Sequence, residues 1–244
     1  MPDSPTDRTN PCPSTTCRLP RGLWRCVRWI SWDSRSVYPS PRYLTSRRAA
    51  DRFVATQRHG TLIAAPLGGH PQVSLLPFVK DGDRIEIHCV QADPTFRALV
   101  ANPHVTFLVS DFLAFSPHDW VDPHDAGRAT LHFRAVAFAC EATYSTDPAD
   151  VAGALRRLLA AYEPQASYVA MENGEFYGAR LRRLAAVQLA IVERQAKFKV
   201  GPAAPPDDAR ERVAAGLRAR DDPGDLRAAA IIEAALTEPP ESSD

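Results

Sequence analysis

Residues 79–94 read VKDGDRIEIHCVQADP, and this stretch contains the signals that decide the fold. Asp81-Gly82 is typical of a β-hairpin turn, because glycine tolerates the backbone angles that a tight turn needs. The next residues, Arg84 to Val90, alternate between polar and apolar, which predicts a half-buried strand. Asp93-Pro94 then predicts the start of a helix, because a carboxylate can cap free N–H groups and proline suits the first helical position.

The period of two continues on both sides of this stretch. Strands are predicted at Thr61 to Ala65 and at Gln72 to Val79, with a turn at Gly68-Gly69, and together with Arg84 to Val90 they form an antiparallel meander. Further β segments are predicted at 105–109, 112–115, 129–144 and 187–191, and a loop at 116–127. Helices are predicted from Thr45 or Ser46 to Gly60, from Asp93 to Asn102, from Asp147, and at 175–184, 207–220 and 226–236.

This order of elements favours an α+β, mainly β fold. Strands joined as hairpins with helices inserted between them are typical of a small antiparallel barrel, whereas regular β-α alternation is not observed. The 244 residues, 45% of them hydrophobic, suffice for one substantial core. We therefore expect one domain over residues 37–236, with inserted and C-terminal helices.

The two ends of the chain differ from this domain. Residues 1–36 are rich in arginine and proline and follow neither period, so a disordered tail, or a translation start that lies near Val37, is expected. Residues 237–244 form an acidic tail. No apolar run has the length of a membrane span, and no signal-peptide core is present, so a cytoplasmic protein is expected.

Charge and motifs exclude several functions. The formal net charge is zero, so no global field attracts nucleic acid or an anionic membrane. The glycine-rich dinucleotide motif, the phosphate loop and the nucleophile elbow are all absent from the sequence. The five cysteines are odd in number and show no two-residue spacing, so Cys89 and Cys140 are interpreted as core thiols and no metal site is assigned.

Several short motifs occur in a characteristic order, and with them the chain resembles the PaiB-like family of FMN-binding negative transcriptional regulators, within the pyridoxamine-phosphate-oxidase-like split barrels. The motifs are 37–43 (VYPSPRY), 74–78 (SLLPF), 88–94 (HCVQADP), Ser116-Pro117, Tyr162-Glu163, 197–199 (KFK) and 208–217. The resemblance implies an FMN-binding split β-barrel, a homodimer with FMN in a cleft between subunits, and either oxidoreductase or regulatory function.

The resemblance and the local chemistry together predict a flavin site. Backbone N–H groups where the third strand ends, around His88, Val90 and Gln91, could face a phosphate, although an ordinary capped helix explains the same residues. The remaining predicted cofactor-binding residues are Ser116 and Pro117, His132 and Phe133 beside the ring, and Lys197 and Lys199 beside the phosphate or the ring's N1–C2=O edge. A structural role is the alternative for these residues: His132 could be an ordinary histidine within a strand, and Lys197 and Lys199 could form a solvated strand end.

Departures from the family pattern leave a second function open. Leu75 stands where members usually have histidine, Gln91 where they have a basic residue, and residues 131–134 and 200–202 also differ. The alternative is therefore a non-catalytic binding or regulatory protein with a degenerate flavin site. DNA binding is possible for such a protein, but the charge does not favour it. The loop at 118–125, with its two histidines and three aspartates, could bind a divalent metal ion, but a polar surface loop is the favoured interpretation. The resemblance implies that this loop lies near the cofactor as a lid.

Overall fold

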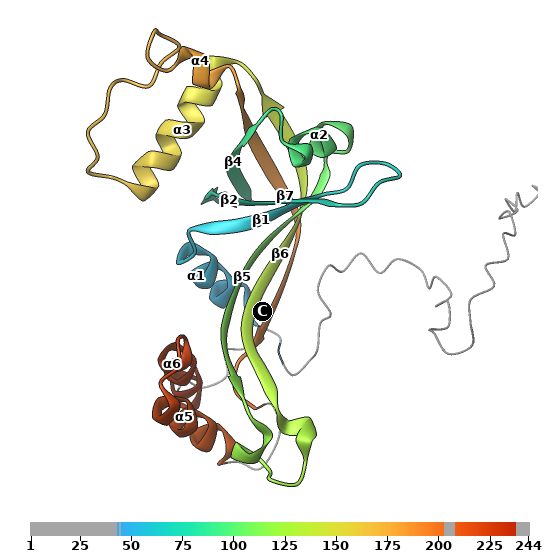
Figure 1. Cartoon of the computed structure of the whole chain (residues 1–244), viewed down its shortest axis with the longest axis vertical. Coiled ribbons are helices and arrows are strands. Elements are labelled where there is room, and N and C mark those ends of the chain that lie inside the picture. Colours follow the sequence, from blue (N-terminus) through green and yellow to red (C-terminus); the bar gives the residue numbers. More distant parts are fainter. Residues whose placement is uncertain (1–42, 44, 203–207, 238–244) are drawn as a thin grey trace, which may run out of the picture. The chain divides into compact units, whose positions relative to one another are not determined.

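The computed structural model describes Tyr43 and residues 45–202 and 208–237, all within one compact unit that spans residues 35–244 (Figure 1). The expected tail at 1–36, the motif at 37–42 and the acidic tail from 238 lie outside the described residues. In the described part of the chain, no helix is long and apolar enough to cross a membrane.

Seven antiparallel strands in the described residues form one sheet in the order β2-β1-β5-β6-β7-β4-β3. The two edge strands, β2 and β3, are consecutive in the chain and only Phe78 separates them, so the sheet must curve until its edges meet. This closure gives the predicted barrel. The strands are β1 (His59–Ala64), β2 (Gln72–Pro77), β3 (Val79–Asp81), β4 (Arg84–Val90), β5 (His104–Ser116), β6 (Thr130–Ser145) and β7 (Leu184–Lys199).

The neighbouring strands of the predicted meander pair as expected, but its second strand is divided at Phe78. Strand β2 pairs with β1, and β3 pairs with β4 through the turn predicted at Asp81-Gly82. The strand Arg84–Val90 has the expected bounds, and Ile85 and Ile87 are buried as the alternation predicts. However, β4 pairs with β3 and β7, and it does not continue a ladder from β2. The hairpin rule accounts for one edge of β4, whereas the other edge is occupied by the distant strand β7, which places the fully buried Ala185, Val187 and Leu189 beside β4.

Strands β5, β6 and β7 extend beyond the barrel as a three-stranded ribbon (Figure 1). Helices α5 (Ala209–Arg220) and α6 (Asp225–Thr237) pack against its far end and form a second core around Leu113 and Ala114. Arg212 holds α5 in place by donating hydrogen bonds to the carbonyls of Trp120 and Val121, at 3.0 and 2.9 Å. The predicted C-terminal helices are thus confirmed, and they lie on the ribbon.

The other helices begin at the predicted caps. Ser46, Asp93 and Asp147 each accept a hydrogen bond from a backbone N–H in the first turn. The predicted helix at 175–184 is reduced to four residues, because the chain from Leu184 already belongs to β7. The helices are α1 (Arg47–Ala55), α2 (Pro94–Ala101), α3 (Pro148–Tyr162) and α4 (Gly178–Leu181), and the loop after β5 contains the short 3₁₀ turns η2 (His118–Trp120) and η3 (Ala126–Arg128).

The sequence predicted that Gly60 ends the first helix, and this prediction is wrong. Helix α1 ends at Ala55, and Gly60 is a buried residue of β1. A Cβ atom at this position would lie 2.4 Å from a ring carbon of Phe107, whose side chain is fully buried. The glycine is therefore required by the close approach of β1 to the core.

We expect Gly60→Ala to lower the free energy of unfolding by about 1–3 kcal/mol, because the buried Phe107 ring has no room to move aside. Urea unfolding followed by circular dichroism measures the change. Gly174→Ala is the matched control, since a Cβ there has only ordinary contacts at 3.8 Å. Equal stability of the two variants would contradict the packing argument.

Candidate functional site

Lys197 and Lys199 lie on the outer side of the ribbon, at the end of β7. Because β7 remains extended through Lys199, successive side chains alternate, and Phe198 points inward to pack edge-on against Phe53 with ring centroids 5.3 Å apart. Lys197 lies across from Ala135 and Lys199 across from Phe133. The Lys197 ammonium is 5.9 Å from the centroid of the Phe133 ring, which brings a cation beside an aromatic surface.

Exposed apolar side chains continue this surface onto β5. Phe112 pairs with Phe133, and Phe115 pairs with Leu131, so all four point to the same side of the ribbon. A bulge between Phe112 and Ala114 turns the strand so that both phenylalanines face outward, 64% and 46% exposed, while Leu113 is buried. We call this surface the ribbon face: Phe112, Phe115, Leu131, Phe133, Lys197 and Lys199. The sequence prediction included Phe133 and both lysines but missed the other three, because the bulge that exposes the phenylalanines breaks the period of two.

His132 and Ser116 lie behind this surface and are completely buried. The Gly201 N–H donates to Nδ1 of His132 at 3.0 Å, so this nitrogen is unprotonated. In the neutral ring Nε2 then carries the proton and donates to Oγ of Ser116, also at 3.0 Å. Burial, with the charges of Lys199 and Arg220 adding to it, lowers the pKa of His132 to about 4. Both ring nitrogens are therefore used to hold β5, β6 and the chain after β7 together.

The family departure at 200–202 has its explanation here. Gly201 has a positive φ of 78°, which glycine adopts without strain, and this conformation presents its N–H to His132. Pro117 follows Ser116 directly and begins the η2 turn. Of the predicted site residues in this region, Phe133 and the lysines lie on the surface, whereas the polar atoms of Ser116 and His132 face each other.

The predicted residues at the end of β4 have different surroundings. Gln91 donates its side-chain amide to the carbonyls of Arg182 and Leu184, at 3.1 and 2.8 Å, and its backbone N–H to the carbonyl of Arg183 at 2.9 Å. These bonds fasten the chain between α4 and β7, and they explain the glutamine by a structural role. Next to it, Val90 is 45% exposed, and burial lowers the pKa of the half-buried His88.

The N-terminus of α2 is occupied by its own cap. Oδ1 of Asp93 accepts from the Thr95 N–H at 2.8 Å, and Oδ2 accepts from the Ser74 hydroxyl at 3.1 Å. An anionic phosphate placed there would meet a carboxylate. The donor set at the end of β4 therefore does not fit a flavin phosphate within one chain.

The two groups of predicted residues lie at opposite ends of β7. His88 pairs with Ala186 near its start, whereas Phe133 pairs with Lys199 at its end. At about 3.3 Å per residue, the separation along the strand is roughly 40–45 Å. One chain does not bring these groups together. The ribbon face alone combines cations with an aromatic, apolar surface, and this chemistry fits the phosphate and ring of a flavin.

Two further predictions concern thiols and metal ions. Cys89 and Cys140 are buried free thiols, as expected, and burial raises the pKa of each to about 12. Within the described ranges, no group of three or more His, Cys, Asp or Glu side chains could hold a metal ion.

Comparisons with known proteins agree with this fold and chemistry. Residues 37–193 match the model of the family described as "Putative FMN-binding domain". The flavocytochrome Anf3 from Azotobacter vinelandii is similar in structure, with 20% identity, a TM-score of 0.51, and 68% of this chain and 73% of that one covered. A FAD and heme binding protein from Mycobacterium smegmatis gives 23% identity, a TM-score of 0.51, and 72% and 80% coverage. No curated protein matches the sequence.

The buried His132 makes the stability of the protein depend on pH. Because its pKa is lowered to about 4 in the folded state from about 6.5 when unfolded, the unfolded chain binds more protons between these values. Stability is therefore full above pH 6.5 and falls as the pH drops towards 4, by up to about 3 kcal/mol. Urea unfolding between pH 7.5 and 4.5 measures this loss.

His132→Gln removes the titration while an amide can still accept from Gly201 and donate to Ser116. We expect the stability difference between wild type and this variant to shrink as the pH falls. The same substitution at the exposed His104 is the control. A difference that stays constant with pH would show that His132 does not cause the dependence.

Proposed function

The chain belongs to the FMN-binding domain family, and we propose that it is a flavoprotein that holds FMN against the ribbon face and works as a homodimer. The observation that supports this site is the Lys197 ammonium beside the Phe133 ring on an exposed apolar surface. Apolar and aromatic side chains with a few charged groups are the usual lining of a flavin site. The Lys197–Phe133 pair provides both.

Bound flavin supplies the hydride or electron transfer, so the expected activity is that of an oxidoreductase. The chain's own residues contribute position and charge. Phe133 and Phe112 offer apolar surface to the ring. Lys197 and Lys199, on the same side of β7, offer positive charge to the phosphate or to the N1–C2=O edge of the ring.

A second copy is part of the proposal because the ribbon face is open in one chain. A flavin ring lying on Phe112 would have its other side in water, whereas flavin sites bury most of the ligand surface. The outer face also extends across the sheet to Leu75, which is 66% exposed. We propose that a partner covers this face and brings the partner's β4 end to the flavin. The cytoplasm suits such a protein, since its described cysteines are free thiols.

A regulatory or binding protein without redox chemistry is the second candidate. It is favoured by Gln91, which stands where the resembling family has a basic residue and whose amide is engaged within the chain, and by Asp93, whose carboxylate caps α2. Flavin that binds but is not reduced by NADH or NADPH, with salt-sensitive binding to promoter DNA, would favour this function over the first. Chromatography of the released flavin separates FMN from FAD, which the similar mycobacterial protein binds.

We expect the double variant Lys197→Gln, Lys199→Gln to bind FMN at least tenfold more weakly than wild type, because each lost cation near a phosphate contributes on the order of 1 kcal/mol. Titration of the apoprotein with FMN, followed by absorbance between 350 and 500 nm, measures the affinity. Lys80→Gln is the matched control, since Lys80 lies on the edge strand β3, outside the ribbon face, and pairs with Asp51 of α1. Wild-type protein that takes up no flavin, or a double variant with unchanged affinity, would refute this site.

We expect Leu75→Glu to shift the protein from dimer to monomer, because a charge on the outer face of β2 would be buried against the partner. Light scattering after size-exclusion chromatography measures the mass. Leu67→Glu introduces the same charge in the turn before β2, where the side chain is 85% exposed, and should leave the dimer intact. A wild-type monomer at micromolar concentration would overturn the dimer proposal.

A further inference from the structure

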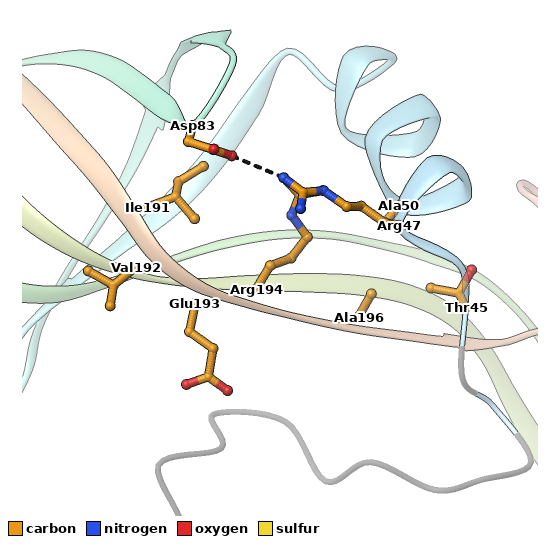
Figure 2. Close-up of a pocket in the computed structure, with 9 residues that line it drawn as sticks. All are labelled: Thr45, Arg47, Ala50, Asp83, Ile191, Val192, Glu193, Arg194 and Ala196. Atoms are coloured by element: carbon orange, nitrogen blue, oxygen red, sulfur yellow. Dashed lines mark hydrogen bonds and ion pairs between the residues drawn. The ribbon is translucent and has the colours of Figure 1, made fainter. Parts of the chain in front are cut away.

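A separate cavity of about 480 Å³ lies between the start of α1, the β3–β4 hairpin and the middle of β7. Figure 2 shows its lining, in which the guanidinium groups of Arg47 and Arg194 lie at the centre and apolar side chains such as Ile191 and Val192 lie beside them. Its volume is that of a small-molecule pocket rather than of a single ion. The lining residues are Thr45, Arg47, Ala50, Asp83, Ile191, Val192, Glu193, Arg194 and Ala196.

Arg194 is the central polar group of this cavity, and its side chain is only 12% exposed. Its Nη1 donates to Asp51 at 2.8 Å, and its guanidinium lies over the Phe138 ring at 5.4 Å. The opposite edge is unused: Nε is buried without a hydrogen-bond partner among the described residues, and Nη2 is 3.9 Å from Asp83, too far for a hydrogen bond. Nε and Nη2 together form the edge with which arginine binds a carboxylate or phosphate through two parallel bonds.

A second guanidinium stands at the mouth of the cavity. Arg47, at the first position of α1, donates to Asp83 at 3.3 Å, and both side chains are mostly exposed. Exposed ion pairs of this kind contribute little to stability, so Arg47 can change its partner at small cost. Figure 2 shows Glu193 pointing away from Arg194, and its carboxylate accepts from Gln195 instead. Asp83 is then the one carboxylate of the lining that an anion would displace.

We propose that this cavity binds a small molecule with an oxyanion head and an apolar body. The head, a carboxylate or a phosphate, is held by the Nε/Nη2 edge of Arg194, and Arg47 moves from Asp83 to the head when the ligand binds. The body lies against Ile191, Val192 and Ala196. The site is distinct from the ribbon face, and its existence does not depend on flavin binding.

Three probes of similar size test the proposal on the full-length, flavin-loaded protein: benzoate, phenyl phosphate and the neutral benzamide. We expect isothermal titration to detect benzoate or phenyl phosphate at millimolar affinity or better, and benzamide at least tenfold more weakly. The better of the two anions identifies the head group. Arg194→Lys keeps a cation for Asp51 but loses the two-bond edge, so it should weaken anion binding about tenfold or more. Arg47→Gln should weaken it severalfold.

Arg157→Lys is the matched control. Arg157 already uses its Nε/Nη2 edge to bind Glu86, at 2.9 and 2.7 Å. This substitution should leave the probe affinities unchanged. Equal binding of benzamide and benzoate, or unchanged binding by Arg194→Lys, would overturn the proposal. Release of FMN by phenyl phosphate in the wild type that is lost in Arg194→Lys would also overturn it, because the cavity would then be part of the flavin site.

Discussion

Strand β7 forms ladders on both of its edges, and the rest of the structure depends on this double pairing. Its first half lies between β4 and β6, where Ala185, Val187 and Leu189 complete the main core. Its second half continues with β6 alone into the ribbon, and it carries Arg194 on one side and Lys197 on the other. Because side chains alternate along one strand, a single element supplies a cation to each candidate site without bringing the two sites together.

Local features of the fold could be predicted from the sequence because they depend on a few adjacent residues. The bounds of Arg84–Val90, the cap at Asp93 and the extended Lys197–Lys199 segment all follow from short-range chemistry. The pairing of β4 with β7 could not be predicted this way, because the hairpin with β3 uses only one edge of β4 and tertiary packing decides which distant strand occupies the other. The role of Gly60 was missed for the same reason, since the Phe107 ring that excludes a side chain comes from another strand.

The candidate sites were only partly visible in the sequence. The lysines stand out, as two of the three lysines in the chain occur in the Lys-Phe-Lys segment. Arg194 does not stand out among many arginines, because its significance comes from the unused edge of its guanidinium, which requires coordinates. Gln91 shows the opposite case: its departure from the family pattern suggests a lost ligand contact, while the structure gives its amide two carbonyl partners.

The ladder between β4 and β7 joins parts of the chain that are far apart in sequence, since Arg84 pairs with Ala190. During synthesis, β4 therefore leaves the ribosome long before its partner exists. Until β7 emerges, the backbone N–H and C=O groups on that edge of β4 are unpaired, and unpaired strand edges make nascent chains prone to aggregate. Closure of the barrel must therefore await translation of the second half of the protein, because β7 supplies the strand between β4 and β6.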